Sequence, residues 1–112
     1  MRLLPLILLA ACASPDTIRP FALNPNFEER LADPGKVDLA CYDEGGRLDS
    51  GSLKQWNDSY CGCVDLAFSV VWISRYIHCD IEKVRKHENC HIETGARKEA
   101  RAKCAKDFPT RA

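Results

Sequence analysis

The sequence has no excess of charge of either sign: its 112 residues carry 16 basic and 16 acidic side chains. No basic stripe indicates a nucleic-acid surface, and no acidic block indicates a solvated tail, so nucleic acid is not an expected partner. The longest apolar run, residues 3–9, is too short to span a bilayer. Phosphate-binding and dinucleotide-binding glycine loops are absent, as is a Ser-His-Asp order. The length allows one small domain.

The short apolar run has the layout of a secretory signal. Met1 and Arg2 supply a positive start, Leu3–Leu9 is apolar apart from Pro5, and the small residues Ala10 and Ala11 follow. An ordinary cleaved signal followed by an incidental cysteine is one interpretation of this pattern. Either way, the rest of the chain is expected outside the cytoplasm.

The four residues Leu9-Ala10-Ala11-Cys12 resemble the lipobox of bacterial lipoproteins. The resemblance implies that residues 1–11 are a signal peptide, that cleavage precedes Cys12, and that acyl chains on Cys12 hold the protein on a membrane. Ala13 replaces the aspartate that argues for inner-membrane retention in many lipoproteins. The expected location is therefore the outer membrane, facing the periplasm.

Six further cysteines follow the lipobox. An even number in an oxidising compartment predicts up to three disulfides, although many pairings are possible and the sequence does not choose among them. The rival interpretation is a zinc site made of thiolates, for which the C-x-C pair is an incomplete signal. The six are Cys41, Cys61, Cys63, Cys79, Cys90 and Cys104.

Proline content divides the chain into a tether and a domain. Residues 12–35 contain four prolines, which predicts an extended tether between membrane and domain, with at most one helical turn at Phe27–Leu31. Residues 36–112 are then a small domain whose limited core requires disulfides.

Two hydrophobic patterns inside the domain predict strands. Val37, Leu39 and Cys41 alternate with Asp38 and Ala40, and residues 67–77 are rich in β-branched and aromatic side chains. Residues 43–46 predict a turn, and residues 48–58 a loop with at most a short helix.

The C-terminal third predicts one long helix. Asp80 is a good N-cap, no proline occurs from Ile81 to Lys106, and Pro109 marks the stop, with Gly95 as the single weak point. The expected fold is α+β: a small disulfide-stapled domain in which a short β-sheet packs on one long C-terminal helix.

The predicted helix carries His87-Glu88-Asn89-Cys90-His91, an H-E-x-x-H motif. Residues four apart share a helical face, so His87 and His91 can direct imidazole nitrogens at one zinc ion. Glu88 is adjacent and can take a proton from zinc-activated water. The alternative is a solvated helix in which both histidines simply border the packed face.

This motif resembles that of the zincin metallopeptidases. The resemblance implies Zn²⁺ on His87 and His91, Glu88 as the general base, and hydrolysis of peptide bonds. It covers only a few residues. Asn89 and Glu93 occupy positions that are usually apolar, or small at the second, and the glycine–histidine extension of the metzincins is absent.

The third zinc ligand is not assigned by the motif. We favour Glu99, which can reach the metal only if the helix breaks near Gly95. The other candidates are His78, Asp80, Glu93, Asp107, Asp43, Glu44 and Asp65.

Two functions therefore remain. The first is a membrane-anchored zinc metallopeptidase of the cell envelope that acts on a protein or peptide there. The second is a non-catalytic envelope lipoprotein, a protein-binding adaptor or exclusion factor. A third ligand near the two histidines distinguishes the first from the second.

Overall fold

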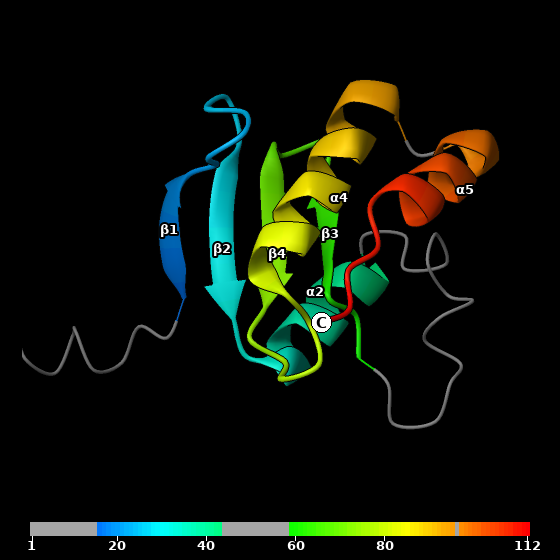
Figure 1. Cartoon of the computed structure of the whole chain (residues 1–112). Helices are drawn as coiled ribbons and strands as arrows, with labels where there is room; N and C mark the ends of the chain where they lie inside the picture. The colour runs from blue at the N-terminus through cyan, green and yellow to red at the C-terminus, as the bar shows by residue number, and fades with distance from the viewer. Residues whose placement is uncertain (1–15, 44–58, 96) are drawn as a thin grey trace, which may run out of the picture.

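A four-stranded sheet lies between helix α2 on one face and helix α4 on the other, with α5 beside α4 (Figure 1). The computed structural model describes residues 16–43, 59–95 and 97–112. The strand order is β1-β2-β4-β3; β2 and β4 are parallel and the other pairs are antiparallel. The α+β class is confirmed. The elements are β1 (Thr17–Pro20), β2 (Glu28–Ala32), α2 (Pro34–Asp43), β3 (Gly62–Asp65), β4 (Val70–Ser74), α4 (Ile81–Thr94) and α5 (Lys98–Asp107).

Strand β4 supplies both hydrophobic cores, because alternate side chains on a strand point to opposite faces. Val70 and Trp72 pack with the α2 side of the sheet, while Val71 and Ile73 pack with the α4 side. All five β4 residues are buried. The α2-side core also contains Ala32, Val37, Cys41 and Tyr60, and the α4-side core contains Phe21, Cys61 and Val84.

The predicted tether is wrong for its described part, because β1 and β2 form half of the sheet. Two of the prolines lie at the ends of secondary-structure elements and do not prevent those elements from forming. Pro20 ends the edge strand β1, where a missing N–H is tolerated, and Pro34 opens α2, a favoured proline position. The helical turn expected at Phe27–Leu31 is instead mostly strand β2. The domain therefore begins before residue 36.

The strand expected at residues 37–41 is also wrong, since these residues lie in α2. Val37 and Cys41 are buried and Leu39 is 69% exposed, a pattern that fits a helix, whose i and i+4 residues share a face. The sequence pattern of alternating apolar residues is compatible with both structures. Pro34 at the first helical position and the burial of Val37 and Cys41 against the sheet favour the helix.

Only the middle of the strand expected at residues 67–77 forms. Residues 66–69 make a turn in which Ser69 has a φ of 56°, and β4 ends at Ser74. Phe68 and Ile77 are exposed. The turn pairs β4 with β3, an edge strand that the sequence did not reveal. The predicted turn and loop at residues 44–58 lie outside the described residues.

The long C-terminal helix is in fact two helices. Asp80 caps α4 as predicted, its carboxylate accepting a hydrogen bond from the Lys83 N–H at 3.0 Å. The chain then turns at Gly95, whose φ of 89° is readily available to glycine alone. After this break α5 folds back against α4, and a disulfide joins the two helices.

The six cysteines that follow Cys12 all form disulfides, as predicted. The pairs are Cys41–Cys63, Cys61–Cys79 and Cys90–Cys104. These bonds overturn the rival thiolate zinc site, because no thiolate remains among the six. The expected lipobox, with Cys12, lies outside the described residues. None of the described helices has the length and apolar character needed to cross a bilayer.

A buried carboxylate fixes α4 to the sheet. Glu29 of β2 is fully buried and accepts hydrogen bonds from Arg19 of β1, at 2.6 Å, and from Arg85 of α4, at 2.7 Å. Burial raises the pKa of the Glu29 carboxyl above its usual value, against the opposing effect of Arg19. These hydrogen bonds fix helix α4, which carries the histidine motif, to strand β2 of the sheet.

Candidate functional site

The H-E-x-x-H motif lies on the face of α4 that points into the molecule. His87, Glu88 and His91 are all buried, with Glu88 only 1% exposed, and Val84 anchors the same face in the core. The expected helix and the expected common face of the two histidines are therefore present. A buried, charged side chain is costly unless it has a role or a partner, which makes this face unusual.

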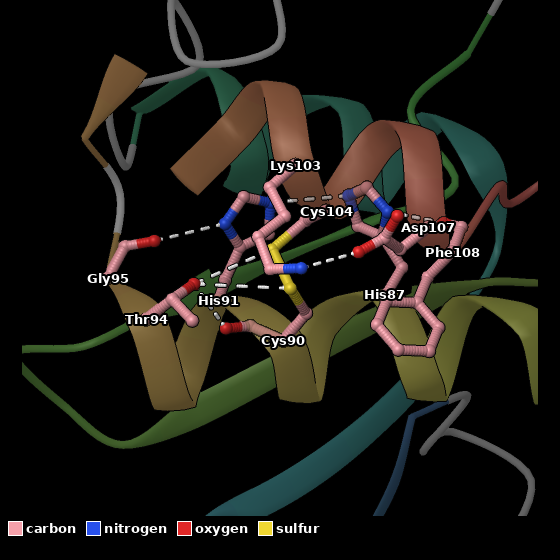
Figure 2. The surroundings of a disulfide bond; sticks show 9 residues. All are labelled: His87, Cys90, His91, Thr94, Gly95, Lys103, Cys104, Asp107 and Phe108. Carbon is pink, nitrogen blue, oxygen red and sulfur yellow. Dashed lines mark hydrogen bonds and ion pairs between the residues drawn. A yellow bond between two sulfur atoms is a disulfide. The ribbon is translucent and has the colours of Figure 1, made fainter. Parts of the chain in front are cut away.

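The two imidazoles point at one another. Nε2 of His87 lies 3.2 Å from Nε2 of His91, and the ring centroids are 4.9 Å apart with planes inclined at 70°. Figure 2 shows the two rings meeting edge on above the helix. Both rings thus present the same nitrogen to the same small region of space.

Backbone carbonyls hold the other nitrogen of each ring. Nδ1 of His87 lies 2.7 Å from the Phe108 oxygen, and Nδ1 of His91 lies 3.2 Å from the Gly95 oxygen (Figure 2). A carbonyl only accepts, so Nδ1 of each ring is the donor. The two Nε2 atoms, 3.2 Å apart, are then placed either to share one proton in a hydrogen bond or to bind one metal ion together.

The arrangement fits two corners of a zinc site. With zinc–nitrogen bonds of about 2.0–2.1 Å and tetrahedral angles, two ligand nitrogens lie about 3.3–3.4 Å apart. The observed Nε2 separation of 3.2 Å is close to that edge. Zinc-bound histidines also usually donate their other N–H to a carbonyl or carboxylate, as both rings do here.

The Cys90–Cys104 disulfide sets the position of these carbonyls. It joins α4 to α5, and α5 leads directly to Phe108. The Thr94 hydroxyl donates to the Cys90 carbonyl at 2.7 Å and lies 3.6 Å from the Cys104 sulfur (Figure 2). Both cysteines are buried, so the covalent link between α4 and α5 is shielded from solvent. This link supports the Phe108 carbonyl, which in turn accepts a hydrogen bond from His87.

His87 and Glu88 line a pocket of about 160 Å³ between α4, the start of β3 and the C-terminal segment. Gly62 lets the helix approach this closely: a methyl group added there would lie 2.5 Å from the Trp72 oxygen and 3.3 Å from Oε2 of Glu88. The remaining lining residues are Ser59, Tyr60, Cys61, Ala105, Pro109, Thr110 and Arg111.

No third metal ligand joins the histidine pair within the part of the chain that the structure describes. The helix does break at Gly95, but the structure does not group Glu99 with the histidines. Ala100 and Cys104 of α5 are buried, whereas Glu99 is exposed.

The alternative ligand candidates are engaged elsewhere or point away. His78 and Glu93 are exposed, and Asp80 caps α4. Asp65 accepts from the Phe68 N–H at 3.1 Å, and Asp107 pairs with Lys103 at 2.6 Å. Glu44 and the side chain of Asp43 lie outside the described residues.

The sequence gives no signal for Arg111 in the pocket lining or for the two backbone carbonyls that hold the imidazoles. Backbone oxygens of Gly95 and Phe108 carry no side-chain signal, and Arg111 belongs to no motif. The Gly62 position gave one available clue, a glycine between two cysteines. Glycine there allows close packing, but the sequence does not say against what.

Comparisons with known proteins give no family for this chain. No family model matches it, and neither a curated protein nor a solved structure matches it significantly.

Proposed function

We propose that this protein is a zinc-dependent peptide hydrolase, with His87 and His91 as metal ligands and Glu88 as the general base. The observation that carries the proposal is the pair of Nε2 atoms 3.2 Å apart, each ring held at Nδ1 by a backbone carbonyl. Zinc, when bound, supplies Lewis acidity to polarise a carbonyl and make water acidic near neutral pH.

Glu88 has the position that a general base requires. It follows His87 directly, and both line the same pocket, so substrate and water entering the pocket meet its carboxylate. Its low exposure, 1%, surrounds the carboxylate with protein rather than bulk water. Glu88 takes a proton from the attacking water and returns it to the leaving amine, which is the role of a general base and then acid.

The proposed location is the cell envelope, with a lipid on Cys12 anchoring the chain to the outer membrane on its periplasmic side. The resemblance of Leu9–Cys12 to a lipobox supports the anchor. The three disulfides support an oxidising compartment.

Metal content of variants tests this proposal. The full chain, produced by export into an oxidising compartment, is expected to bind about one zinc per molecule. His87→Ala and His91→Ala should abolish binding, since each removes a ligand. Glu88→Gln should keep the metal and lose hydrolysis of a mixed peptide library by about two to four orders of magnitude. Atomic absorption and mass spectrometry give the two readouts.

The matched control is His78→Ala. His78 is the remaining histidine, is exposed and packs edge on against Tyr76, away from the pair. Zinc content should be unchanged in this variant. Wild-type protein without zinc at micromolar concentration, or equal zinc loss in His78→Ala, would contradict the proposal.

A specific observation favours the second candidate, a non-catalytic adaptor or exclusion factor. No third ligand joins the histidines in residues 16–43, 59–95 and 97–112, and several large apolar side chains of this region are exposed. They include Leu39 and Tyr42 on α2, and Phe68 in the β3–β4 turn. Zinc retained in every variant except His87→Ala and His91→Ala, with no peptidase activity in the wild type, would support the adaptor.

A further inference from the structure

Arg111 is the one permanently positive side chain among the residues that line the pocket beside Glu88. The described side chains there include a single carboxylate, that of Glu88, and the hydroxyls of Ser59, Tyr60 and Thr110. A guanidinium is always charged and matches the geometry of a carboxylate with two parallel N–H groups. Arg111 and the proposed general base therefore line the same pocket.

The backbone holds Arg111 firmly in this position. Arg111 forms a β-bridge with Cys79, and its carbonyl accepts a hydrogen bond from Lys83 Nζ at 3.3 Å. The neighbouring Thr110 carbonyl accepts from the Asp80 N–H at 3.0 Å. Cys79 is itself disulfide-bonded to Cys61, another lining residue, so the segment that Arg111 bridges is covalently linked to the pocket.

The side chain of Arg111 is also directed. Its Nη2 donates to the Ser59 carbonyl at 3.4 Å, and its Cζ lies 5.9 Å from the centre of the Tyr76 ring. A guanidinium stacked on an aromatic ring and bonded to a carbonyl loses less entropy when it binds an anion than a free side chain would. Arg111 is thus oriented before any substrate arrives.

The pocket volume limits what can lie beside this charge. Sites for drug-sized molecules have volumes of about 300–1,000 Å³. The volume here is about 160 Å³, which suits a single small residue rather than a long peptide segment.

We infer that Arg111 binds the carboxylate of the substrate, so that the enzyme acts on peptides whose terminal carboxylate, or an acidic side chain, lies next to the scissile bond. The inference rests on the proposed function for its chemistry. Glu88 and Arg111 then have separate roles. Glu88 transfers the proton at the scissile amide, and Arg111 determines which residue of the substrate enters the pocket.

Binding of a dipeptide tests the inference without turnover. Full chain carrying Glu88→Gln is stripped of metal and titrated by NMR with N-acetyl-glycyl-alanine and with its C-terminal amide. The free acid should bind about tenfold or more tightly than the amide, the range expected for a charge-assisted hydrogen-bonded pair. Adding Arg111→Gln should remove that preference, and Arg111→Lys should keep part of it, as a charge without the planar fork.

The matched control is Lys98→Gln in the same background, which removes one positive charge from the exposed first turn of α5. It should leave the preference intact. Equal binding of acid and amide, a preference that survives Arg111→Gln, or no binding of either at millimolar concentration would overturn the inference. Because the measurement needs neither zinc nor hydrolysis, its failure is separate from failure of the zinc proposal. An acidic side chain is distinguished from a terminal carboxylate by N-acetyl-glycyl-aspartate diamide.

Discussion

The two faces of the sheet are built differently, although each is covered by a helix and each is held by disulfides. Against α2 the packed side chains are mainly apolar, with Val37, Cys41 and Trp72 at the centre. Against α4 the apolar core shares its layer with the buried His87, Glu88 and His91. The α2 side is an apolar core of the kind that any small domain needs. The α4 side also buries polar side chains, which a hydrophobic core does not need.

This difference indicates where function lies. Burying polar groups opposes folding by about 1–3 kcal/mol each when they lack hydrogen bonds, and an apolar α4 face would avoid that penalty. The imidazoles instead donate to the backbone carbonyls of Gly95, which follows α4, and Phe108, which follows α5. These bonds fix both rings with their Nε2 atoms 3.2 Å apart, as a shared ligand would require.

The largest expected effect comes from removing one disulfide on each face, by Cys90→Ser/Cys104→Ser or by Cys41→Ser/Cys63→Ser. The two bonds close segments with sequence separations of 14 and 22, so each loss should lower the free energy of unfolding by about 2–4 kcal/mol. Zinc affinity should fall about 10- to 100-fold only in the α4-side variant, because that bond positions Phe108. Urea denaturation and zinc competition titration measure the two effects.

An equal loss of zinc affinity in both disulfide variants would show that general loosening, and not the α5 position, controls the histidine pair. Affinity unchanged in both would show that the carbonyl support is unimportant.

A smaller effect is expected from an added methyl group on each face. Gly62→Ala places Cβ 2.5 Å from the Trp72 oxygen and 2.8 Å from Val84 Cγ1, so we expect about 1–3 kcal/mol of destabilisation. Gly35→Ala in α2 meets no atom within 4 Å and should stabilise the helix by up to about 1 kcal/mol. Thermal denaturation compares them; a stable Gly62→Ala protein would contradict the close packing of α4 on β3.

The smallest effect is expected at the outer surface of α2. Leu39 is 69% exposed, so Leu39→Lys should change the free energy of unfolding by less than about 0.5 kcal/mol in either direction. Chemical denaturation of the monomer gives the value. A loss of several kcal/mol would restore the interpretation of residues 37–41 as a strand with a buried Leu39.

Local signals predict the parts of the fold that depend on local physics. The Asp80 cap, the disulfide bonding of six cysteines and the α+β class follow from side-chain chemistry, hydrophobic patterning and an even cysteine count. The prediction of a tether at residues 12–35 is wrong for its described part because proline opposes structure only at certain positions, and its place within an element decides its effect. Residues 37–41 fit two periodicities, and only the presence of a sheet beneath Val37 distinguishes them.

The candidate site is predictable to the extent that it lies on one helix. The spacing of His87 and His91 places both on the same face, as the structure has it. The position of Glu99 relative to the histidines depends on how α5 follows Gly95, and the Cys90–Cys104 bond that joins α5 to α4 is a pairing that the sequence does not give. Arg111 joins the pocket through a β-bridge to Cys79, a contact between distant segments of the chain that no local pattern encodes.

The C-x-C pair at Cys61 and Cys63 joins the edge strand to opposite sides of the sheet. Cys61 is bonded to Cys79 at the start of α4, and Cys63 is bonded to Cys41 in α2. If Cys61 and Cys63 exchanged partners, the isomer would have the same number of disulfides. Strand β3 would then be held in a different position, and Gly62 would be displaced from Glu88. Oxidative assembly of this chain is therefore a matter of isomer choice as well as oxidation, and a fully oxidised preparation is not by itself a native one.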